Sequence, residues 1–362
     1  MDSFAFMIHP LDESDVTKKY SAARFVPKFI IAQMLKHAPP FKASDITGVT
    51  SKYNKIDGSF VTCPLTAKQM ISLPESFVIN KIIQAGKVAE QLGAKILGLG
   101  AYTSVVGDAG LSVAKNLKIP VTTGNSYTVA TAIEGAKLAS CKMGHNLDEV
   151  KVAIIGATGS IGSVCAEILA RDVKTLILVG KDEVKLHRLA NRILYDTGLV
   201  AKISLDLRQS LKHADVVICA TNSVEILINP EDLKPGAVVC DVSRPRNVSR
   251  RVAELRNDVL VIEGGLVEVP GDVNFNLNFG FPPGMAYACM AETMILALEK
   301  KYESYTLGRD VSIKQVMEID KLAKKHGFRV AGFRSFEKAV TEVEINSIRD
   351  NAMRKVLVTE TA

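Results

Sequence analysis

The stretch KVAIIGATGSIGS at residues 151–163 limits the fold more than any other part of the sequence. It opens with a continuous apolar run, typical of a strand buried on both faces. Gly156, Gly159 and Gly162 follow at three-residue spacing, and helical spacing of apolar residues begins at Ser163. A strand, a glycine turn and a helix in this order allow close approach of a pyrophosphate to the backbone and to a helix N-terminus. The pattern predicts a dinucleotide-binding turn; the alternative is a tight turn without a ligand.

A second buried strand is expected at residues 175–179, followed by Gly180, Lys181 and Asp182. In NAD-binding units, an acidic residue roughly 20 residues beyond the glycines binds the ribose hydroxyls. Here Lys181 comes first, and a cation at this position suits the additional phosphate of NADP. The sequence therefore favours NADP(H), while Asp182 keeps NAD(H) open as the alternative.

Further apolar strands alternate with helices, which predicts an α/β fold with a Rossmann-type, doubly wound parallel sheet; these strands are expected at residues 214–220, 238–242 and 259–262. A long helix is expected at residues 129–142, directly before the glycine strand. We therefore predict three parts: an N-terminal α/β substrate-binding domain with the linker helix at 1–145, an NADP-binding Rossmann domain at 146–284, and a C-terminal helical segment at 285–362.

Three local predictions concern single elements. The Asp-Gly pair at residues 57–58 interrupts an alternating stretch and predicts a hairpin turn. An amphipathic helix is expected at residues 74–91, because its apolar residues have helical spacing. An almost wholly apolar helix is expected at residues 285–298, after Pro282, Pro283 and Gly284.

Composition excludes several classes of protein. The 362 residues carry a net charge of +6, spread along the chain without a basic stripe, which argues against nucleic-acid binding and fits anionic ligands. The six cysteines form no C-x-x-C pair and have no zinc-like spacing with histidine, so we expect a reduced cytoplasmic protein without a metal site. No run approaches 18 apolar residues, and we expect no membrane span.

Polar residues follow the strands of the predicted sheet, where ligands of such sheets bind. Thr221, Asn222 and Ser223 follow the fourth strand, residues 243–245 follow the fifth, and Gly264 follows the sixth. We predict that Thr221, Asn222, Ser223 and Gly264 contact the cofactor. The alternative is that these are ordinary polar turns.

Two loops of the first domain, GAYTSVVGD and TTGNSYT, are dense in Thr, Ser, Asn and Gly between apolar strands. Such loops suit hydrogen bonding to a carbonyl or to a pantetheine-like group. The substrate-binding residues predicted from them are Tyr102, Thr103, Ser104, Gly124, Asn125 and Tyr127. Helix capping is the alternative role for Asn125.

Cys289 is the strongest candidate for a nucleophile, because it lies about one turn beyond Pro283 and Gly284 and so near a helix start. A helix N-terminus stabilises a thiolate, which can attack a thioester or aldehyde carbonyl. The alternative is a small buried apolar residue. Glu292 would oppose a thiolate on the same side of the helix unless it is paired or acts as an acid. His9, at a strand tip, is a candidate partner from elsewhere in the sequence.

These stretches together resemble one family, the long-chain acyl-[acyl-carrier-protein] reductases of the cyanobacterial type. The likeness covers nearly the whole chain, and the matching motifs occur in one order: FAFMIHP, GAYTSVV, TTGNSYTVA, VAIIGATGSIGSVCAEIL, GGLVEV, YACMAETMILALE, LGRD and MEIDKLAKKHGF. The glycine motif alone would be unspecific, whereas the TTGN loop, the cysteine helix and the later landmarks make the match specific.

The resemblance implies NADPH-dependent reduction of fatty acyl-ACP, or acyl-CoA, to a fatty aldehyde. Cys289 matches the family's nucleophile, which holds the acyl group as a thioester, and Lys181 takes the place of a basic residue near the adenosine phosphate. An acyl carrier protein or acyl-CoA is the implied acyl donor, and an aldehyde-consuming enzyme is a further partner. Gly156, Thr158, Gly159 and Ile161 match the family's cofactor turn, and we predict that Ala157 and Ser160 between them also contact the cofactor.

Two other readings stay open. One is an oxidoreductase like shikimate dehydrogenase or glutamyl-tRNA reductase, acting on a small polar substrate. The first of these needs a Lys–Asp pair in the first domain, and the second a cysteine there, where Cys63 lies in a TCP turn with no matching motif. The other reading is a regulatory protein that binds NADP without turnover and has no dependence on Cys289.

Overall fold

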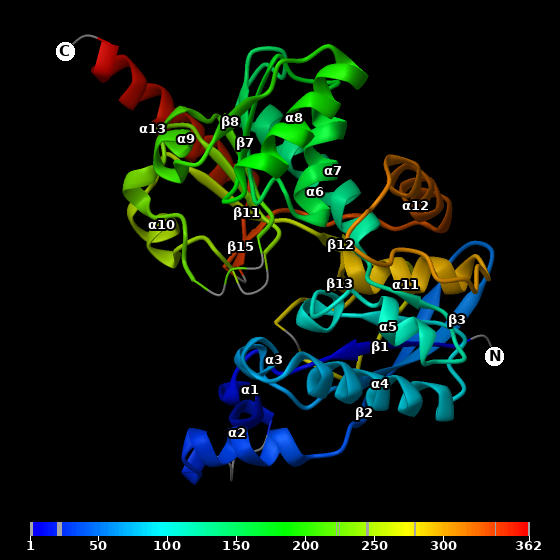
Figure 1. The fold of residues 1–362 in the computed structure, drawn as a ribbon. Coiled ribbons are helices and arrows are strands. Elements are labelled where there is room, and N and C mark those ends of the chain that lie inside the picture. The colour runs from blue at the N-terminus through cyan, green and yellow to red at the C-terminus, as the bar shows by residue number, and fades with distance from the viewer. Residues whose placement is uncertain are drawn as a thin grey trace. The chain divides into compact units, whose positions relative to one another are not determined.

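The computed structural model describes residues 3–19, 24–221, 223, 225–243, 246–278, 280–336 and 338–360. The chain forms two compact units, shown as a ribbon in Figure 1. Unit 1 comprises residues 1–127, 267–311 and 317–329. Unit 2 comprises residues 128–266, 312–316 and 330–362. Unit 2 is thus largely an insertion into the sequence of unit 1.

This division differs from the predicted one in two places. The first boundary lies at residues 127–128, inside the linker helix, instead of after residue 145. Residues 285–311, predicted to open a C-terminal segment, belong to unit 1. The physical reason is close packing, because an added Cβ at Gly98 on the unit 1 sheet would lie 2.0 Å from Thr293 Oγ1 on the returning helix.

Unit 1 is built on a five-stranded sheet in the order β2-β3-β1-β4-β5. The pairs β3–β1, β1–β4 and β4–β5 are parallel, and only β2 runs antiparallel, to β3. The strand bounds are β1 Ser3–Ile8, β2 Phe41–Thr50, β3 Lys55–Thr62, β4 Leu97–Leu99 and β5 Val121–Thr122.

Helices cover both faces of this sheet, α4 (Glu75–Gln91) on one and α11 (Ala288–Leu298) on the other (Figure 1). Alternating side chains of β1 explain the two layers. Ala5 and Met7 join the buried cluster with α4, whereas Phe6 lies against Phe60, at 6.4 Å between ring centroids. The predicted helix at 74–91 is confirmed, because α4 begins at Glu75 and ends at Gln91.

The remaining elements of residues 1–127 and 267–329 are short, apart from α12. Three residues before α11 form a strand, so the predicted helix at 285–298 begins later, at Ala288. The bounds are α1 Glu13–Lys19, α2 Lys28–His37, α3 Ala67–Ser72, the 3₁₀ helix η2 Ala101–Ser104, α5 Leu111–Lys115, β12 Leu266–Glu268, β13 Met285–Tyr287 and α12 Ile313–His326.

The β2–β3 hairpin turns at residues 51–54, and the turn predicted at residues 57–58 is wrong. Ser51 Oγ accepts hydrogen bonds from two backbone N–H groups of the turn, each at 3.1 Å, and this closes the loop. Gly58 lies within β3, where an added Cβ would be 2.5 Å from the Phe4 ring. The glycine therefore serves packing against Phe4.

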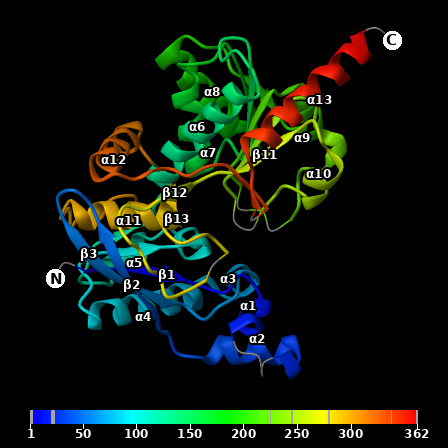
Figure 2. The same ribbon diagram turned by 180° about the vertical axis from the view of Figure 1, so that it is seen from behind.

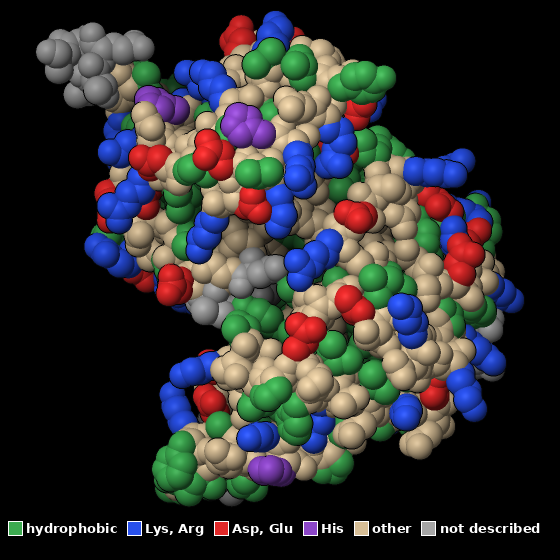
Figure 3. Space-filling model, viewed as in Figure 1, with side chains coloured by type: hydrophobic (Ala, Val, Ile, Leu, Met, Phe, Trp, Pro, Cys, Tyr) green, Lys and Arg blue, Asp and Glu red, His purple; other side chains and the backbone are tan. Residues whose placement is uncertain are grey.

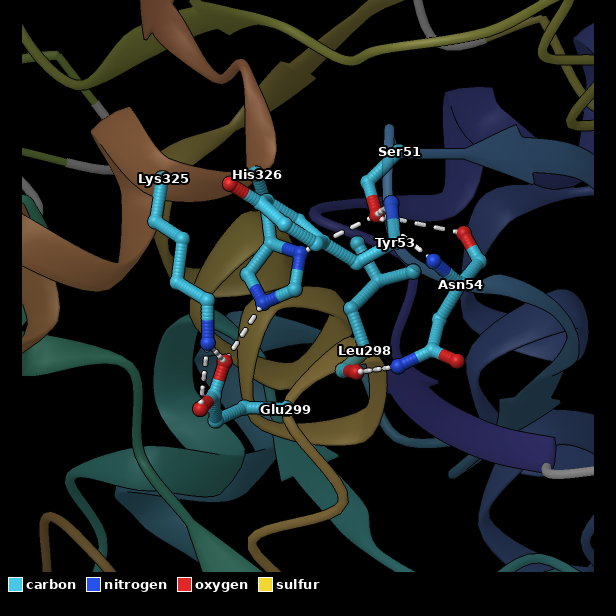
Figure 4. Close-up of polar contacts among 7 residues, drawn as sticks. All are labelled: Ser51, Tyr53, Asn54, Leu298, Glu299, Lys325 and His326. Carbon is cyan, nitrogen blue, oxygen red and sulfur yellow. Dashed lines mark hydrogen bonds and ion pairs between the residues drawn. The ribbon is translucent and has the colours of Figure 1, made fainter.

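The hairpin turn is tied to the ends of α11 and α12 by a polar cluster, drawn in Figure 4. His326 is buried, with Nε2 2.7 Å from Glu299 Oε2 and Nδ1 3.1 Å from Ser51 Oγ. Lys325 Nζ donates to both oxygens of Glu299, each at 2.8 Å. Asn54 Nδ2 donates to Leu298 O at 2.8 Å, which satisfies a carbonyl at the end of α11.

This cluster predicts a pH dependence of stability. Desolvation raises the pKa of Glu299, but the hydrogen bonds from Lys325 and His326 outweigh it and hold the pKa below its usual value. A lowered folded-state pKa stabilises the protein above the unfolded pKa of about 4.3, and this stability is lost as pH falls through the folded value. Glu299→Gln should cost about 2 kcal/mol at pH 7. Thermal unfolding at several pH values should show the gap between wild type and variant closing in acid; a constant gap would contradict this.

Unit 2 is built on a six-stranded parallel sheet in the order β11-β10-β9-β6-β7-β8. Numbered from β6, this is the order 3-2-1-4-5-6 of dinucleotide-binding sheets, which reverses between β6 and β9. The predicted Rossmann-type α/β fold is confirmed. The bounds are β6 Lys151–Ile155, β7 Thr175–Val179, β8 Lys202–Ser204, β9 Val216–Cys219, β10 Val238–Asp241 and β11 Leu260–Glu263.

Figures 1 and 2 show α6, α7 and α8 on one face of this sheet and α9, α10 and α13 on the other. The glycine turn ends earlier than predicted, because α7 begins at Ser160. The remaining bounds are α6 Asn125–Lys142, α7 Ser160–Leu169, α8 Glu183–Thr197, α9 Leu207–His213, the 3₁₀ helix η3 Pro230–Asp232, α10 Arg250–Leu255, β14 Arg329–Val330, β15 Arg334–Ser335, β16 Lys338–Ala339 and α13 Glu342–Glu360.

None of the helices in the described residues combines the length and apolar character needed to cross a bilayer.

Candidate active site

The glycine turn between β6 and α7 has the backbone shape of a phosphate cradle. Gly156 has φ +79°, and an added Cβ would lie 2.5 Å from Ala220 O. At Gly162 an added Cβ would lie 2.3 Å from Gly156 O. Gly159 is the N-cap of α7 and supplies no side-chain cap, so the N-terminus of α7 is open to an anion. These residues fit the pyrophosphate of a dinucleotide.

The predicted turn residues divide into two groups. Ala157 is buried and its N–H donates to Val179 O at 3.0 Å, so Ala157 anchors the turn to β7. Thr158, Gly159, Ser160 and Ile161 all retain solvent access. These four residues and Gly156, which also keeps solvent access, are placed to contact a ligand directly.

At the tip of β7, Lys181 is exposed and Asp182 is engaged in a helix cap. Asp182 Oδ1 accepts from Lys185 N at 3.0 Å, and this backbone hydrogen bond is the main reason that the pKa of Asp182 is lowered. An added Cβ at Gly180 would lie 3.5 Å from Thr158 Oγ1, which places the glycine turn beside this strand tip. The capping role occupies one oxygen of the carboxylate that would otherwise bind ribose hydroxyls.

A buried hydrogen-bond network supports the loops after β9 and β10. Asp241 Oδ1 accepts from Ser243 N and Oδ2 from Asn247 N, both at 2.9 Å. Asn247 Oδ1 accepts from Thr221 Oγ1, and its Nδ2 donates to Ser223 O at 2.9 Å. The network fixes the strand tip at which Thr221 and Ser223 were predicted to contact the cofactor.

Three of the predicted loop residues, Asn222, Arg244 and Pro245, lie outside the described residues. Gly264 directly follows β11, where an added Cβ would lie 2.8 Å from Cys240 Sγ, so it packs closely against β10. An added Cβ at Gly156 would also lie 3.0 Å from Thr221 Cγ2. The carboxyl ends of β6 and β9 therefore bring the glycine turn and Thr221 together.

In unit 1, Cys289 is the second residue of α11 and is half-buried. Four of the other five cysteines are buried, and burial raises the pKa of Cys63 and of Cys165, each to about 12. Only Cys141 is more exposed than Cys289. Cys289 is therefore the one cysteine that combines solvent access with a place in the first turn of a helix.

The TTGN loop is in direct contact with the backbone of Cys289. Gly124 has φ +76°, and an added Cβ would lie 2.3 Å from Cys289 Cα and 2.4 Å from Cys289 Cβ. A side chain at position 124 would therefore displace the cysteine or the loop. Of the predicted substrate-binding residues, Gly124 is the one that the structure places against the candidate nucleophile.

Glu292 accepts four hydrogen bonds and is fully buried. Its Oε1 accepts from Thr122 Oγ1 at 2.5 Å and from Thr306 Oγ1 at 2.7 Å. Its Oε2 accepts from Ser126 Oγ at 2.6 Å and from Tyr127 N at 2.9 Å. The carboxylate thus joins α11 to the TTGN loop and to the segment at Thr306. Glu292 is therefore paired, which is one of the states that the sequence left open.

The predicted residues at η2 use their hydroxyls within the turn itself. Thr103 Oγ1 donates to Gly100 O at 2.8 Å and Ser104 Oγ to Ala101 O at 2.6 Å, and both residues are buried. Tyr102 is also buried, and desolvation raises its pKa. Asn125 is the first residue of α6, so it begins the helix rather than preceding it as the N-cap.

His9 has backbone partners at both ring nitrogens. Nδ1 lies 2.9 Å from Pro10 O, and Nε2 accepts from Tyr102 N at 3.2 Å. Desolvation lowers the pKa of His9, although the Pro10 carbonyl and Asp15 oppose this. These contacts give His9 a structural role at the end of β1 and assign it no part beside Cys289.

Sequence reasoning missed Thr306 and the pair Asp241 and Asn247. Thr306 directly precedes the LGRD landmark, which marked the region without giving it a role. Asp241 ends an apolar strand, and a carboxylate at a strand tip was the available signal there. Among the described residues, no cluster of three or more His, Cys, Asp or Glu has the arrangement of a metal site.

The sheet order and the glycine turn, together with homology to reductases, support an oxidoreductase that uses a dinucleotide cofactor. The family model described as shikimate / quinate 5-dehydrogenase matches residues 137–263, all of which lie in unit 2. This match covers the dinucleotide-binding part of the chain.

Curated proteins similar to this chain include two reductases and an aminotransferase. The long-chain acyl-[acyl-carrier-protein] reductase of Synechococcus elongatus is 26% identical over 81% of this chain and 88% of its own length. Aminotransferase PigE of Serratia sp. is 28% identical over 85% of this chain, which spans only 36% of that longer protein. Glutamyl-tRNA reductase of Actinobacillus succinogenes is 22% identical over 54% of this chain and 47% of its own length.

Proposed function

We propose that this chain reduces fatty acyl thioesters, carried on acyl carrier protein or on CoA, to fatty aldehydes with NADPH. The observation that carries the proposal is the half-buried thiol of Cys289 in the first turn of α11, with Gly124 against its backbone. Similarity to an acyl-ACP reductase over 81% of the chain supports the choice of substrate. Glutamyl-tRNA reductase matches the chain over a shorter part, 54% of its length.

Cys289 acts as the nucleophile in this proposal. Its sulfur forms a C–S bond to the acyl carbon, the bond from that carbon to the carrier's sulfur breaks, and the carrier leaves as a thiol with the proton from Cys289. The dipole of α11 favours negative charge at this helix end. A bound NADPH supplies the hydride for reduction, and Cys289 sulfur is the group that leaves as the aldehyde forms.

The glycine turn and Lys181 hold the cofactor. Gly156, Gly159 and the N-terminus of α7 receive the pyrophosphate, and exposed Lys181 binds the additional phosphate of NADPH. Thr221 and Ser223, fixed by Asn247, form the strand tip on the nicotinamide side. The acidic acyl carrier protein is the proposed donor, in keeping with the net charge of +6.

We also propose an aldehyde-consuming partner enzyme. Support comes from the relative named an aminotransferase, in which sequence like this chain makes up 36% of the length. Aminotransferases act on carbonyl groups, and an aldehyde leaving Cys289 presents one.

The covalent step has a direct test. The intact mass of the protein is measured after mixing with acyl-ACP in the absence of NADPH, and peptide mapping locates the adduct. We expect one acyl group on Cys289, lost as aldehyde when NADPH is added. Cys141→Ser should be acylated normally, because Cys141, although exposed, lies in the last turn of α6 and has no helix N-terminus to favour its thiolate. An adduct on Cys141, or none at all, would refute the proposal.

The cofactor preference has its own prediction. Lys181→Ala should raise KM for NADPH about tenfold, the equivalent of one charge-assisted hydrogen bond, and change KM for NADH little. Lys174→Ala is the control, because Lys174 is exposed before β7, at the opposite end of that strand. Steady-state kinetics with both cofactors measure the effect. An equal rise for NADPH and NADH would remove Lys181 from phosphate recognition.

A further inference from the structure

The region around α2 exposes large apolar side chains that take no part in the core. Phe25 is 92% exposed, Phe29 71% and Met34 64%. Figure 3 shows apolar side chains gathered over this part of unit 1. Rings with this exposure stand out from the surface instead of lining a groove. We call Phe25, Phe29, Ile30 and Met34 the α2 surface.

The opposite side of α2 is fixed to the rest of unit 1. Ile31 is the buried residue of this helix, and Ala32 O accepts from Gln69 Nε2 at 2.7 Å. Ile30 and Met34 are four residues apart and so share one side of the helix, and Phe29 is exposed as well. Phe29, Ile30 and Met34 therefore face outward on a helix whose inner side is anchored through Ile31 and Ala32.

The chain directly before and after α2 carries only basic charges, although α1, which contacts α2, begins with Glu13 and Asp15. Residues 16–44 contain no Asp or Glu, and α2 itself ends in Lys36 and His37. A basic segment with protruding aromatic and aliphatic side chains has the composition of helices that lie in the headgroup region of a bilayer. From residue 24 onward, the basic residues of this stretch are Arg24, Lys28, Lys36 and Lys42, of which Lys42 pairs with Asp45.

We propose that the α2 surface binds membranes that contain anionic phospholipids. The apolar side chains enter the boundary between headgroups and acyl chains, and the flanking cations contact the lipid phosphates. An acidic protein would satisfy the charge equally well, but several exposed apolar side chains on one basic helix are the pattern of helices that lie in a membrane interface. The proposal does not depend on which substrate the protein reduces.

The test is sedimentation of the full chain with vesicles. We expect binding to vesicles of phosphatidylglycerol and phosphatidylcholine in equal parts, much weaker binding to phosphatidylcholine alone, and loss of binding in high salt. The double variant Phe29→Ser and Met34→Ser should bind about a hundredfold more weakly.

The matched control is the double variant Tyr195→Ser and Leu255→Ser, which removes exposed apolar side chains on α8 and α10 and should bind as the wild type does. Thermal unfolding should be unchanged in both variants, because all four residues are exposed. Three results would overturn the proposal: no vesicle binding by the wild type, vesicle binding by the α2 variant as strong as that of the wild type, or a loss of binding in the control variant as large as in the α2 variant. So would loss of self-association or of carrier-protein binding in the α2 variant without any effect on vesicles.

Discussion

Cys289→Ser is expected to lower the rate of aldehyde formation by a factor on the order of 1,000 or more while leaving NADPH binding unchanged. Loss of a covalent nucleophile removes a whole reaction route, and comparable substitutions in other enzymes have effects of this size. The hydroxyl is nearly the same size as the thiol, so packing against Gly124 is kept. Aldehyde release under saturating substrate measures the rate, and quenching or enhancement of NADPH fluorescence measures binding.

Cys141→Ser provides the matched control, because Cys141 has greater solvent access than Cys289 but lies in the last turn of α6, away from any helix N-terminus. Its rate should equal that of the wild type. If the Cys289→Ser protein formed aldehyde at the wild-type rate, a thioester intermediate on Cys289 would be refuted. Joint loss of rate and of NADPH binding would instead indicate damage to the fold.

Glu292→Leu is expected to destabilise the protein by at least about 4 kcal/mol. The substitution removes the acceptor for four donors that are buried around the carboxylate, and each donor left unsatisfied costs about 1–3 kcal/mol. A loss of this size lowers Tm by roughly 10 °C in a protein of this kind. Thermal unfolding followed by circular dichroism measures the shift.

Glu292→Gln separates shape from hydrogen bonding. The amide keeps one acceptor oxygen, and the hydroxyls of Thr122, Ser126 and Thr306 can turn to accept from its NH₂, so the loss should be about half as large. Glu303→Ala is the control, because the Glu303 side chain is 64% exposed and pairs only at the surface with Lys301; it should change stability by about 0.5 kcal/mol or less. Equal stability of Glu292→Leu and the wild type would remove Glu292 from its supporting role.

The sequence predicted unit 2 well because its physics is local. Strands buried on both faces have continuous apolar sequences. The turn after β6 needs glycine because its backbone makes close contacts with residues nearby in the sequence and with the bound pyrophosphate. The predicted strand at 175–179 agrees with β7 at both ends. Gly156 and Gly162 have the close backbone neighbours that such a motif requires.

The place of α11 was not predictable by the same means. All its residues except Cys289 are buried, so its apolar positions show no outward side and do not indicate which sheet it covers. The decisive contacts are long-range, such as the one between Gly98 and Thr293. A single sequence contains no local pattern that reports them.

The candidate site was predictable in its reactive residue but not in its support. Cys289 and Gly124 belong to motifs that stand out in the sequence. Glu292 was recognised only as a charge in need of a partner, since its donors come from positions up to 170 residues away. The Asp241 and Asn247 network escaped for a related reason, because it depends on how two strand tips meet.

The order of residues in unit 1 also has a consequence for biosynthesis. The ribosome completes β1 to β5 by residue 122, then the whole dinucleotide sheet, and only afterwards α11 and Thr306. Unit 2 can begin to fold as it leaves the ribosome. The unit 1 sheet, by contrast, keeps the face that carries Phe6 and Phe60 uncovered until about 170 further residues have been made. Nascent chains arrested before residue 288 should therefore recruit chaperones through this exposed aromatic face.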